Sequence, residues 1–279
     1  MFEKVNGMHP DKIADRIAGA IVDIAYLQEE NPKVAVEVLI GHGECNIIIE
    51  SSVNFNKPEL KSNITYKVKE ISKQDNIKVR IKSVKQDVYL AENQSEEIRC
   101  GDNGIFKGVP LTEEEITLCA IARNIYEKYP YDGKYILDAK AKKLVICQSN
   151  AKNEDLRKLY TDAIINPLGE WTGGTDVDTG ATNRKLGSDM AQSVTGGGLM
   201  GKDLSKADVS VNIYCFFEAQ KLHHIVTASC AIGDKEITFR VDDSEKDTFT
   251  VPYSDVVKIA MEYIKKVGGF EKFAEWGLC

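Results

Sequence analysis

The chain has 279 residues, of which 43% are hydrophobic, and a formal net charge of −7 at pH 7. This length and composition allow a large buried core, in one multi-lobed unit or two domains, and exclude a disordered chain. The acidic balance argues against a nucleic-acid or anionic-membrane partner, because either would favour a basic surface.

The predicted elements alternate between helices and strands. Pro10 suits the first position of a helix that continues to about Leu27. In chain order, the later predictions are strands at 33–40 and 46–55, a helix around 60–71, a strand at 77–84, a helix opened by a capping box at Thr112 and Glu115, a hairpin over 134–149, helices over 153–163 and 204–222, a hairpin over 225–241 and a helix over 254–267. This order predicts antiparallel sheets backed by helices.

The compartment is indicated by what the chain lacks. The sequence has no apolar stretch typical of a signal peptide or a membrane span, so we expect a cytoplasmic protein without a membrane partner. The seven cysteines form no CxxC pair and no Cys/His ligand spacing. We therefore expect reduced, mostly buried thiols rather than disulfides or a zinc site.

Two stretches, 85–108 and 169–208, combine glycine with charged residues and show little apolar periodicity. Long irregular segments of a compact chain are usually functional loops or disorder, so the chemistry is expected there. In the second stretch, glycines can turn backbone N–H groups toward an anion, and basic side chains can bind a polyphosphate: Arg184, Lys185, Lys202 and Lys206. Asp178 and Asp208 could hold magnesium or a cationic substrate group. The alternative is a solvated surface loop, which the interleaving of basic residues and glycine clusters makes the weaker interpretation.

Two local motifs have competing interpretations. Residues 196–202 satisfy GxxxxGK, but Asp203 stands where a phosphate-binding loop needs a hydroxyl, and the preceding segment does not resemble a strand, so we expect no true P-loop. His9-Pro10-Asp11-Lys12 places an imidazole, a carboxylate and an ammonium at a helix N-terminus, where the macrodipole favours an anion. Any of these side chains could instead simply cap the helix.

Taken together, the motifs resemble those of S-adenosylmethionine synthetases along nearly the whole chain. The similar segments are HPDKIAD at 9–15 (family GHPDKIAD), GDNG at 101–104 (GDQG), DGK at 132–134 (DxK), NPLG at 166–169 (INPTG), GGGLMGKDLSKAD at 196–208 (GGGxFSGKDxxKxD) and SCAIG at 229–233 (SYAIG). The chain departs from the family pattern at Met8, Glu170, Thr195 and Met200. It is also shorter, with a cropped loop between Gln86 and Asp102 that resembles the family's active-site lid.

The resemblance implies a role for each matching residue. Catalysis would rest on His9, Lys134, Arg184 and Lys202. ATP and its phosphates would also contact Asp132, Trp171, Asp178 and Lys185, with Trp171 stacked on adenine. Methionine would be bound by Glu50, Gln86, Asp102, Asp178 and Lys206. Magnesium would be held by Asp11 and Asp208, and potassium by Glu37. Without the resemblance, Glu37 and Glu50 read as ordinary charges on the polar face of a strand.

The resemblance also implies an activity and an architecture. The methionine sulfur would attack C5' of ATP, and the released tripolyphosphate would be hydrolysed to pyrophosphate and phosphate. The alternatives are another ATP-dependent transferase, such as a kinase or ligase, and a non-catalytic shortened homologue. The expected fold is α+β, with three similar, trimmed βαβ-type domains around a pseudo-threefold axis: an N-terminal domain at 1–108, a short central domain at 109–168 and a C-terminal domain at 169–279. The expected assembly is a homodimer, possibly a tetramer, with active sites between subunits.

Overall fold

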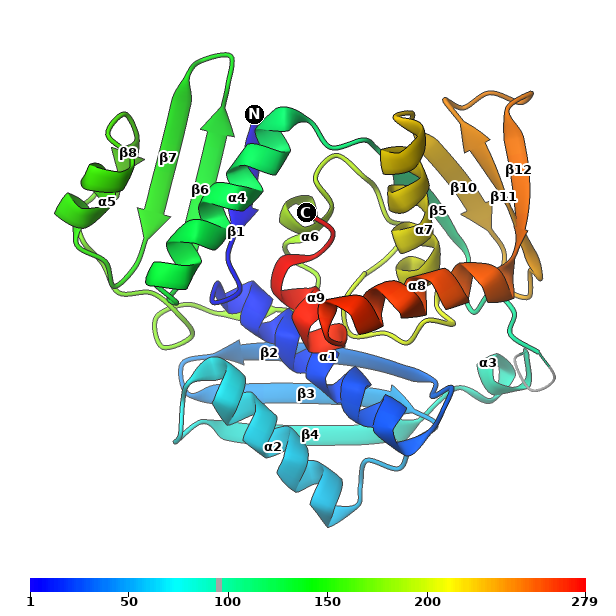
Figure 1. Ribbon diagram of the computed structural model, residues 1–279. Helices are drawn as coiled ribbons and strands as arrows, with labels where there is room; N and C mark the ends of the chain where they lie inside the picture. The colour runs from blue at the N-terminus through cyan, green and yellow to red at the C-terminus, as the bar shows by residue number, and fades with distance from the viewer. Residues whose placement is uncertain (94–96) are drawn as a thin grey trace.

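The computed structural model describes residues 1–93 and 97–279. These residues form three sheets of four strands each, arranged around a common centre (Figure 1). The β2 sheet has the order β4 (Lys78–Lys85), β3 (Glu44–Ser51), β2 (Val34–Gly41), β9 (Gly180–Ala181). The β6 sheet has the order β1 (Phe2–Val5), β6 (Gly133–Asp138), β7 (Lys143–Gln148), β8 (Ile164–Ile165). The β10 sheet has the order β12 (Thr248–Pro252), β11 (Glu236–Val241), β10 (Val226–Cys230), β5 (Gly104–Gly108). Pairing is antiparallel in the β10 sheet, whereas β3 and β4, and β7 and β8, are parallel.

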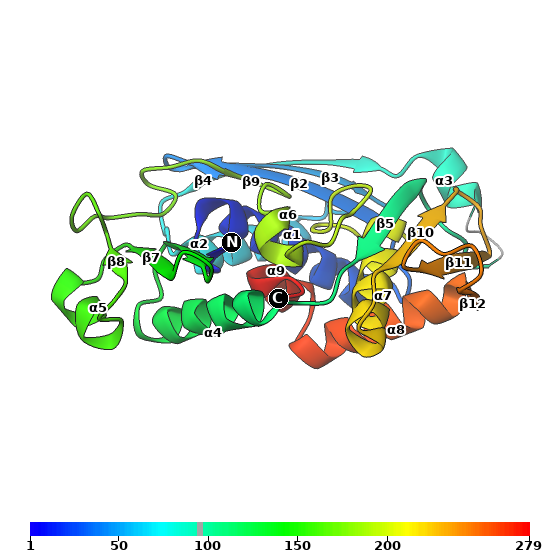
Figure 2. The same ribbon diagram turned by 90° about the horizontal axis from the view of Figure 1, so that it is seen from above.

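Helices cover one side of each sheet and leave the other side exposed (Figure 2). The β2 sheet is covered by α1 (Pro10–Gln28) and α2 (Pro58–Ser72), the β6 sheet by α4 (Glu113–Lys128) and α5 (Asn153–Leu159), and the β10 sheet by α7 (Ala207–Leu222) and α8 (Tyr253–Val267). The short helices are α3 (Val88–Asn93), α6 (Leu186–Met190) and α9 (Phe270–Trp276). The α+β class with mixed sheets in similar lobes is therefore confirmed. Among the helices of residues 1–93 and 97–279, none combines the length and apolar character of a bilayer-spanning segment.

Helix α1 forms the centre of the molecule. Its residues are buried almost without interruption from Pro10 to Ala25, and it packs against β2, β9, α2 and α9. Gly19 allows α9 to approach, because a Cβ at this position would lie 2.5 Å from the carbonyl oxygen of Phe270. A helix buried on all sides has a fixed orientation, so the residues at its N-terminus are held rigidly.

Most predicted elements are confirmed, but some boundaries and several elements differ. The helix predicted at 153–163 ends at Leu159, and the helix predicted at 204–222 begins at Ala207. The sequence-based prediction missed β1, β12 and α9, and it described as irregular the segments that form α3, β5, α6 and β9. Strand β1 pairs with β6, and β5 pairs with β10, so each is stabilised by a partner far along the chain. The domain boundaries stay a prediction, and residues 94–96 of the expected lid lie outside the described residues.

The prediction that all cysteines are reduced is wrong for one pair. Cys119 in α4 and Cys279 form a disulfide across a sequence separation of 160 residues. The remaining cysteines are free: Cys45, Cys100, Cys147, Cys215 and Cys230. The pairing could not be inferred from the sequence, because only the packing of the C-terminal segment against α4 brings these distant residues together.

Candidate active site

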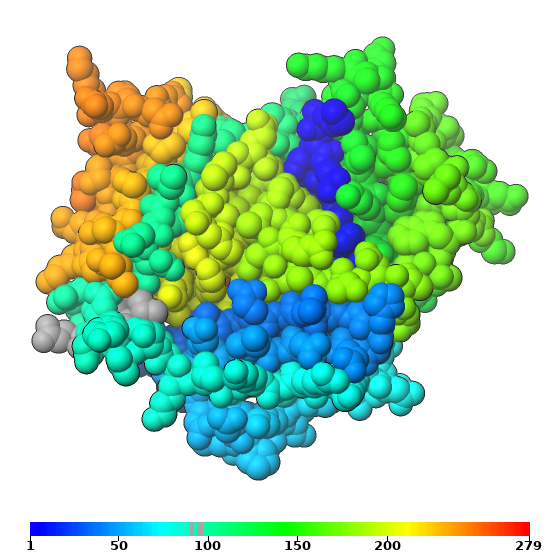
Figure 3. Space-filling view, turned by 180° about the vertical axis from the view of Figure 1, so that it is seen from behind, coloured from blue at the N-terminus to red at the C-terminus, as the bar shows by residue number. Residues whose placement is uncertain are grey.

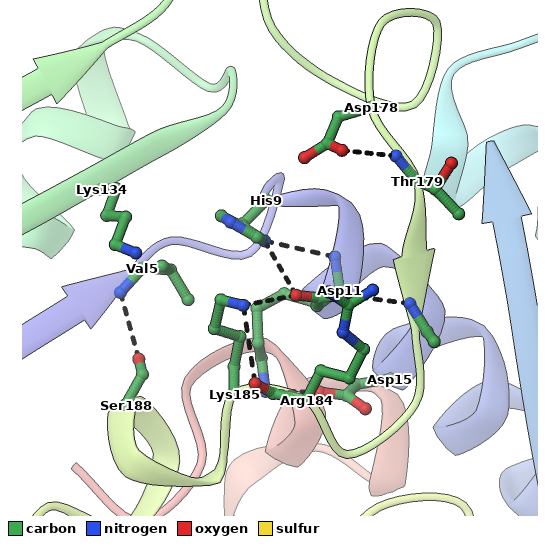
Figure 4. A network of polar contacts seen from close by, with 12 residues as sticks. Val5, His9, Asp11, Asp15, Lys134, Asp178, Thr179, Arg184, Lys185 and Ser188 are labelled. Atoms are coloured by element: carbon green, nitrogen blue, oxygen red, sulfur yellow. Dashed lines mark hydrogen bonds and ion pairs between the residues drawn. The ribbon is translucent and has the colours of Figure 1, made fainter. Parts of the chain in front are cut away.

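The N-terminus of α1 meets the long glycine-rich loop. His9 is the N-cap residue, and its Nδ1 accepts a hydrogen bond from the Asp11 backbone N–H at 3.2 Å. Asp11 is buried, and its carboxylate accepts the Ala181 N–H at 2.9 Å and pairs with Lys185 (Figure 4). Arg184 Nε lies 3.6 Å from the same carboxylate. The close approach depends on Gly180, where a Cβ would lie 1.9 Å from the Pro10 carbonyl oxygen.

The protonation states follow from burial and from the neighbouring cations. Burial, and then the positive charge of Lys185, lower the pKa of His9 to about 4. His9 is therefore neutral at pH 7, and because its Nδ1 accepts a hydrogen bond, its Nε2 carries the proton. Burial would raise the pKa of Asp11, but the hydrogen bonds from Lys185 and Ala181 outweigh this effect and lower it. Asp11 is therefore a carboxylate surrounded by cations.

Other segments complete this group, which we call the α1 cluster: His9, Asp11, Asp132, Lys134, Asp178, Arg184 and Lys185. Lys134 extends from β6 and pairs with Glu3 at 3.0 Å, with its side chain 43% exposed and therefore accessible to a ligand. Asp132 is buried, accepts the Gly174 N–H at 3.3 Å, and has its pKa raised to about 6 by burial. Figure 4 shows Lys185 and Arg184 beside Asp11, Lys134 on the other side of His9, and Asp178 above them. The cationic side chains thus converge from β6 and the long loop.

A second group, the α7 cluster, consists of Asp102, Lys202, Lys206 and Asp208. Lys202 pairs with Asp208 in the first turn of α7, and Lys206 lies 3.9 Å from Asp102. Gly197 is needed here, because a Cβ would lie 2.6 Å from Asp208 Oδ2. The cluster therefore joins both irregular stretches of the sequence.

The GxxxxGK segment does not form a P-loop. Asp203, the residue after the lysine, is buried, and its carboxylate accepts the backbone N–H groups of Val34 and Ser205, each at 2.8 Å. It anchors the loop to β2 instead of contacting a phosphate or a metal. The segment before the glycines contains α6 and no strand, as predicted.

The two clusters lie along the same edge of the β2 sheet. Ala181 pairs with Leu39 of β2, and Lys202 forms a bridge with Ala35 of the same strand. These contacts are four positions apart along β2, which corresponds to about 14 Å. Figure 3 shows the long loop filling the middle of the face between the three lobes. One chain therefore presents both groups of cations on one face, but not in direct contact.

The remaining predicted site residues lie outside both clusters. Glu37 of β2 accepts a hydrogen bond from Thr182 Oγ1, so it lies between the clusters. Glu50 is exposed on β3, and Gln86 follows β4 with its backbone N–H bonded to the Ser51 carbonyl at 3.3 Å. Among the described residues of a single chain, no hydrogen bond or ion pair joins Glu50 or Gln86 to either cluster.

Trp171 lines a separate hollow of about 450 Å³ together with Asn150 and Glu170. Its Nε1 donates to Asn166 Oδ1 at 3.1 Å, which fixes the ring. Glu170, which replaces a family arginine, accepts the Asn153 backbone N–H at 2.9 Å. The glutamate that replaces the family arginine therefore accepts a hydrogen bond from the first residue of α5.

Sequence reasoning missed one set of charges beneath the α1 cluster. Lys12 is almost completely buried and pairs with two carboxylates that are equally buried, those of Asp15 and Asp189. The sequence did contain a signal for these buried charges. Lys12 of the HPDK motif stands close to carboxylates on a helix whose other residues are mostly apolar, and a charged residue in such a helix is buried only when it is paired.

The residues suit magnesium bound together with a phosphate rather than a preformed metal cage. No group of three or more His, Cys, Asp or Glu side chains within residues 1–93 and 97–279 could hold a metal ion. Asp11 and Asp208 stand in different clusters, each next to a lysine. Magnesium is commonly held by one or two carboxylates plus substrate phosphates, and this donor set fits that pattern.

Known proteins resemble this chain in sequence and in fold. Residues 1–96 match the profile of the S-adenosylmethionine synthetase N-terminal domain. The chain is 25% identical to the S-adenosylmethionine synthase of Tropheryma whipplei (strain Twist) over 95% of its own length and 85% of that protein, and 28% identical to that of Oenococcus oeni over 77% and 71%. An unusual S-adenosylmethionine synthetase from Campylobacter jejuni has the same fold, with a TM-score of 0.72 and 21% identity, covering 100% of this chain and 95% of that one. The chain is therefore similar to S-adenosylmethionine synthetases in sequence over most of its length, and similar to one of them in fold.

Proposed function

We propose that this protein is a methionine adenosyltransferase that forms S-adenosylmethionine from ATP and L-methionine. The observation that carries the proposal is the α1 cluster, where Lys134, Arg184 and Lys185 converge on a neutral His9 at a helix N-terminus. Such an arrangement can bind a polyphosphate while leaving the adjacent carbon open to attack. The similarity to S-adenosylmethionine synthetases supports the same activity.

The reaction needs little proton transfer at the nucleophile. The thioether sulfur of methionine is neutral, and its attack on C5' of ATP forms a sulfonium while the C5'–O bond breaks. Negative charge then develops on the leaving tripolyphosphate, so preorganised donors are the natural source of rate. His9 Nε2–H would donate to an oxygen near the breaking bond, and Lys134, Arg184 and Lys185 would bind the phosphate oxygens.

The α7 cluster is proposed to act on the same polyphosphate and on methionine. Lys202 would exchange its Asp208 partner for phosphate oxygens, and Lys206 with Asp102 would bind the methionine carboxylate and amino group. Glu50, Gln86 and Asp178 would complete the methionine site, and Asp132 and Trp171 the ATP site. The released tripolyphosphate would be hydrolysed to pyrophosphate and phosphate before release.

Asp11 and Asp208 would hold Mg²⁺, which would supply charge neutralisation to the leaving phosphates. Asp11 is suited to this role because its pKa is lowered and its carboxylate already faces the cationic group. Glu37 would contribute to a K⁺ site, where its carboxylate now meets the Thr182 hydroxyl. We propose the cytoplasm, which supplies ATP, as the compartment.

We propose that the complete site forms in a homodimer, possibly within a tetramer. Glu50 and Gln86, two of the expected methionine residues, lie apart from the clusters in one chain. The outer face of the β2 sheet carries exposed apolar side chains: Leu39 and Ile48, each 50% exposed, and Val84, 40% exposed. Such a face favours association with another protein surface. A second chain packed on this face would bring Glu50 and Gln86 against the partner's clusters.

The proposal is tested by product analysis. The purified protein is incubated with ATP, methionine, Mg²⁺ and K⁺, and S-adenosylmethionine, phosphate and pyrophosphate are measured. We expect S-adenosylmethionine with neither ADP nor AMP. ADP would indicate a kinase and AMP a ligase, whereas no turnover under any of these conditions would indicate a non-catalytic homologue.

A further inference from the structure

Buried charged side chains fix the backbone of the segment that carries Arg184 and Lys185 of the α1 cluster. Lys12 Nζ lies 3.1 Å from Asp15 Oδ2 and 2.6 Å from Asp189 Oδ1. All these side chains are at most 1% exposed, so none of them can touch a substrate directly. Burying charges is costly, and the cost is offset only when partners are well placed.

Each carboxylate is attached to the loop on a different side of Arg184-Lys185. Asp15 Oδ1 accepts the backbone N–H of Asn183, the residue before Arg184, at 2.7 Å. Asp189 lies one helical turn after Lys185, and its backbone N–H donates to the Lys185 carbonyl at 3.0 Å. Lys12 therefore connects, through its carboxylate partners, both ends of the segment that carries the cations.

The same network is anchored to the rest of the core. The Asp189 carbonyl accepts the Leu278 N–H at 2.7 Å, and Lys4 donates to the neighbouring Ser188 carbonyl at 2.7 Å. The segment from Asn183 to Asp189 thus has a rigid base on α1.

We propose that Lys12, Asp15 and Asp189 form a positioning triad that orients Arg184 and Lys185 for polyphosphate binding. The proposal rests on the proposed function, which assigns these two cations to the triphosphate of ATP. The triad residues are positioning residues, since they act through the backbone of the loop. Lys12 is therefore not a phosphate ligand, although it belongs to the HPDK motif.

The structure supplies a matched control on the same helix. Asp23 of α1 also accepts backbone N–H groups from a neighbouring segment, that of Phe270 at 2.7 Å and that of Glu271 at 2.9 Å. The Asp15 and Asp23 carboxylates each accept hydrogen bonds from two donors, one at each oxygen. Asparagine has a single side-chain oxygen, so Asp15→Asn and Asp23→Asn each leave one donor without its acceptor. Both substitutions weaken a buried anchor, but only Asp15→Asn affects the loop that carries Arg184.

The test measures binding of inorganic tripolyphosphate with Mg²⁺ by calorimetry. We expect Asp15→Asn to weaken binding about tenfold, since the loss of one well-placed hydrogen bond from a charged side chain to a phosphate has an effect of about this size. Asp23→Asn should stay within about twofold of the unmodified protein, although both variants melt at lower temperature. Steady-state kinetics should show a raised KM for ATP in Asp15→Asn with an unchanged KM for methionine.

The outcomes separate this inference from the proposed function. Unchanged tripolyphosphate binding in Asp15→Asn, or an equal loss in Asp23→Asn, overturns the positioning role even if the protein makes S-adenosylmethionine. Failure of the unmodified protein to bind tripolyphosphate overturns it as well. Binding that depends on Asp15 without S-adenosylmethionine formation leaves the triad in place and refutes the proposed function alone. If Asp15→Asn does not fold, Asp189→Asn is compared in the unmodified protein and in a variant that carries both Arg184→Met and Lys185→Met. The positioning role predicts that Asp189→Asn adds little to the loss of tripolyphosphate binding once both cations are absent, so a further large loss contradicts it.

Discussion

His9 has two separable functions in this structure, and substitution can distinguish them. Its Nδ1 caps α1 by accepting the Asp11 N–H at 3.2 Å, whereas its Nε2–H is the group proposed to meet the leaving oxygen. Asparagine is a good N-cap residue whose side-chain oxygen can replace Nδ1. The shorter amide does not reach as far as Nε2. His9→Asn should therefore keep the cap and lose the catalytic donor, and His9→Ala should lose both.

The magnitudes follow from these contacts. Loss of an N-cap side chain costs about 0.5–2 kcal/mol of stability, so His9→Ala should unfold at lower denaturant concentration, while His9→Asn should remain close to the unmodified protein. Loss of one preorganised donor to a developing anion costs about 2.7–4 kcal/mol of barrier, or about a hundredfold or more in rate. Both variants should therefore lose similar activity despite different stabilities.

The assays are urea unfolding, S-adenosylmethionine formation from ATP and methionine, and hydrolysis of added tripolyphosphate. Because His9 is placed near the C5'–O bond, we expect His9→Asn to suppress sulfonium formation more than tripolyphosphate hydrolysis. Equal losses in both half-reactions would refute this division of roles. Full activity in His9→Asn would refute the donor role itself.

Further predictions concern charge and stability. Lys202→Met should weaken tripolyphosphate binding about tenfold to a hundredfold, because a charge-assisted contact is lost, whereas Lys221→Met in the exposed last turn of α7 should not. Equal affinities of the two variants by calorimetry would contradict this. Burial raises the pKa of Asp132 from 3.8 to about 6, so the folded state binds the proton of this carboxyl more tightly than the unfolded state does. The stabilisation of the folded state by this proton is therefore lost as pH rises from about 4 to about 6. Asp132→Asn should therefore gain on the order of 1–3 kcal/mol of stability over the unmodified protein above pH 6, and less at pH 4, in urea titrations. Cys119→Ser should cost about 2–5 kcal/mol, because the link to Cys279 spans 160 residues, and reductant should then have no further effect on its melting temperature.

Much of the local structure was determined by the sequence itself. The apolar spacing after Pro10, the Thr112–Glu115 capping box and the hairpin around Gly233 depend on residues close together in the chain, and the structure reproduces each of them. The chemistry of the glycine-rich loop could also be recognised, because its glycines and basic residues lie in one continuous stretch of sequence.

Tertiary structure alone decided which of these segments meet. Short strands such as β1 and β9 have too few residues to show a periodic pattern, and they exist because a distant strand offers hydrogen-bond partners. The Cys119–Cys279 link and the Lys12–Asp15–Asp189 triad depend on side chains that are brought together by folding over more than 150 residues of sequence. The free energy of a buried ion pair depends on the burial of its charges and on the distance between them, and neither quantity can be derived from the order of residues in the sequence.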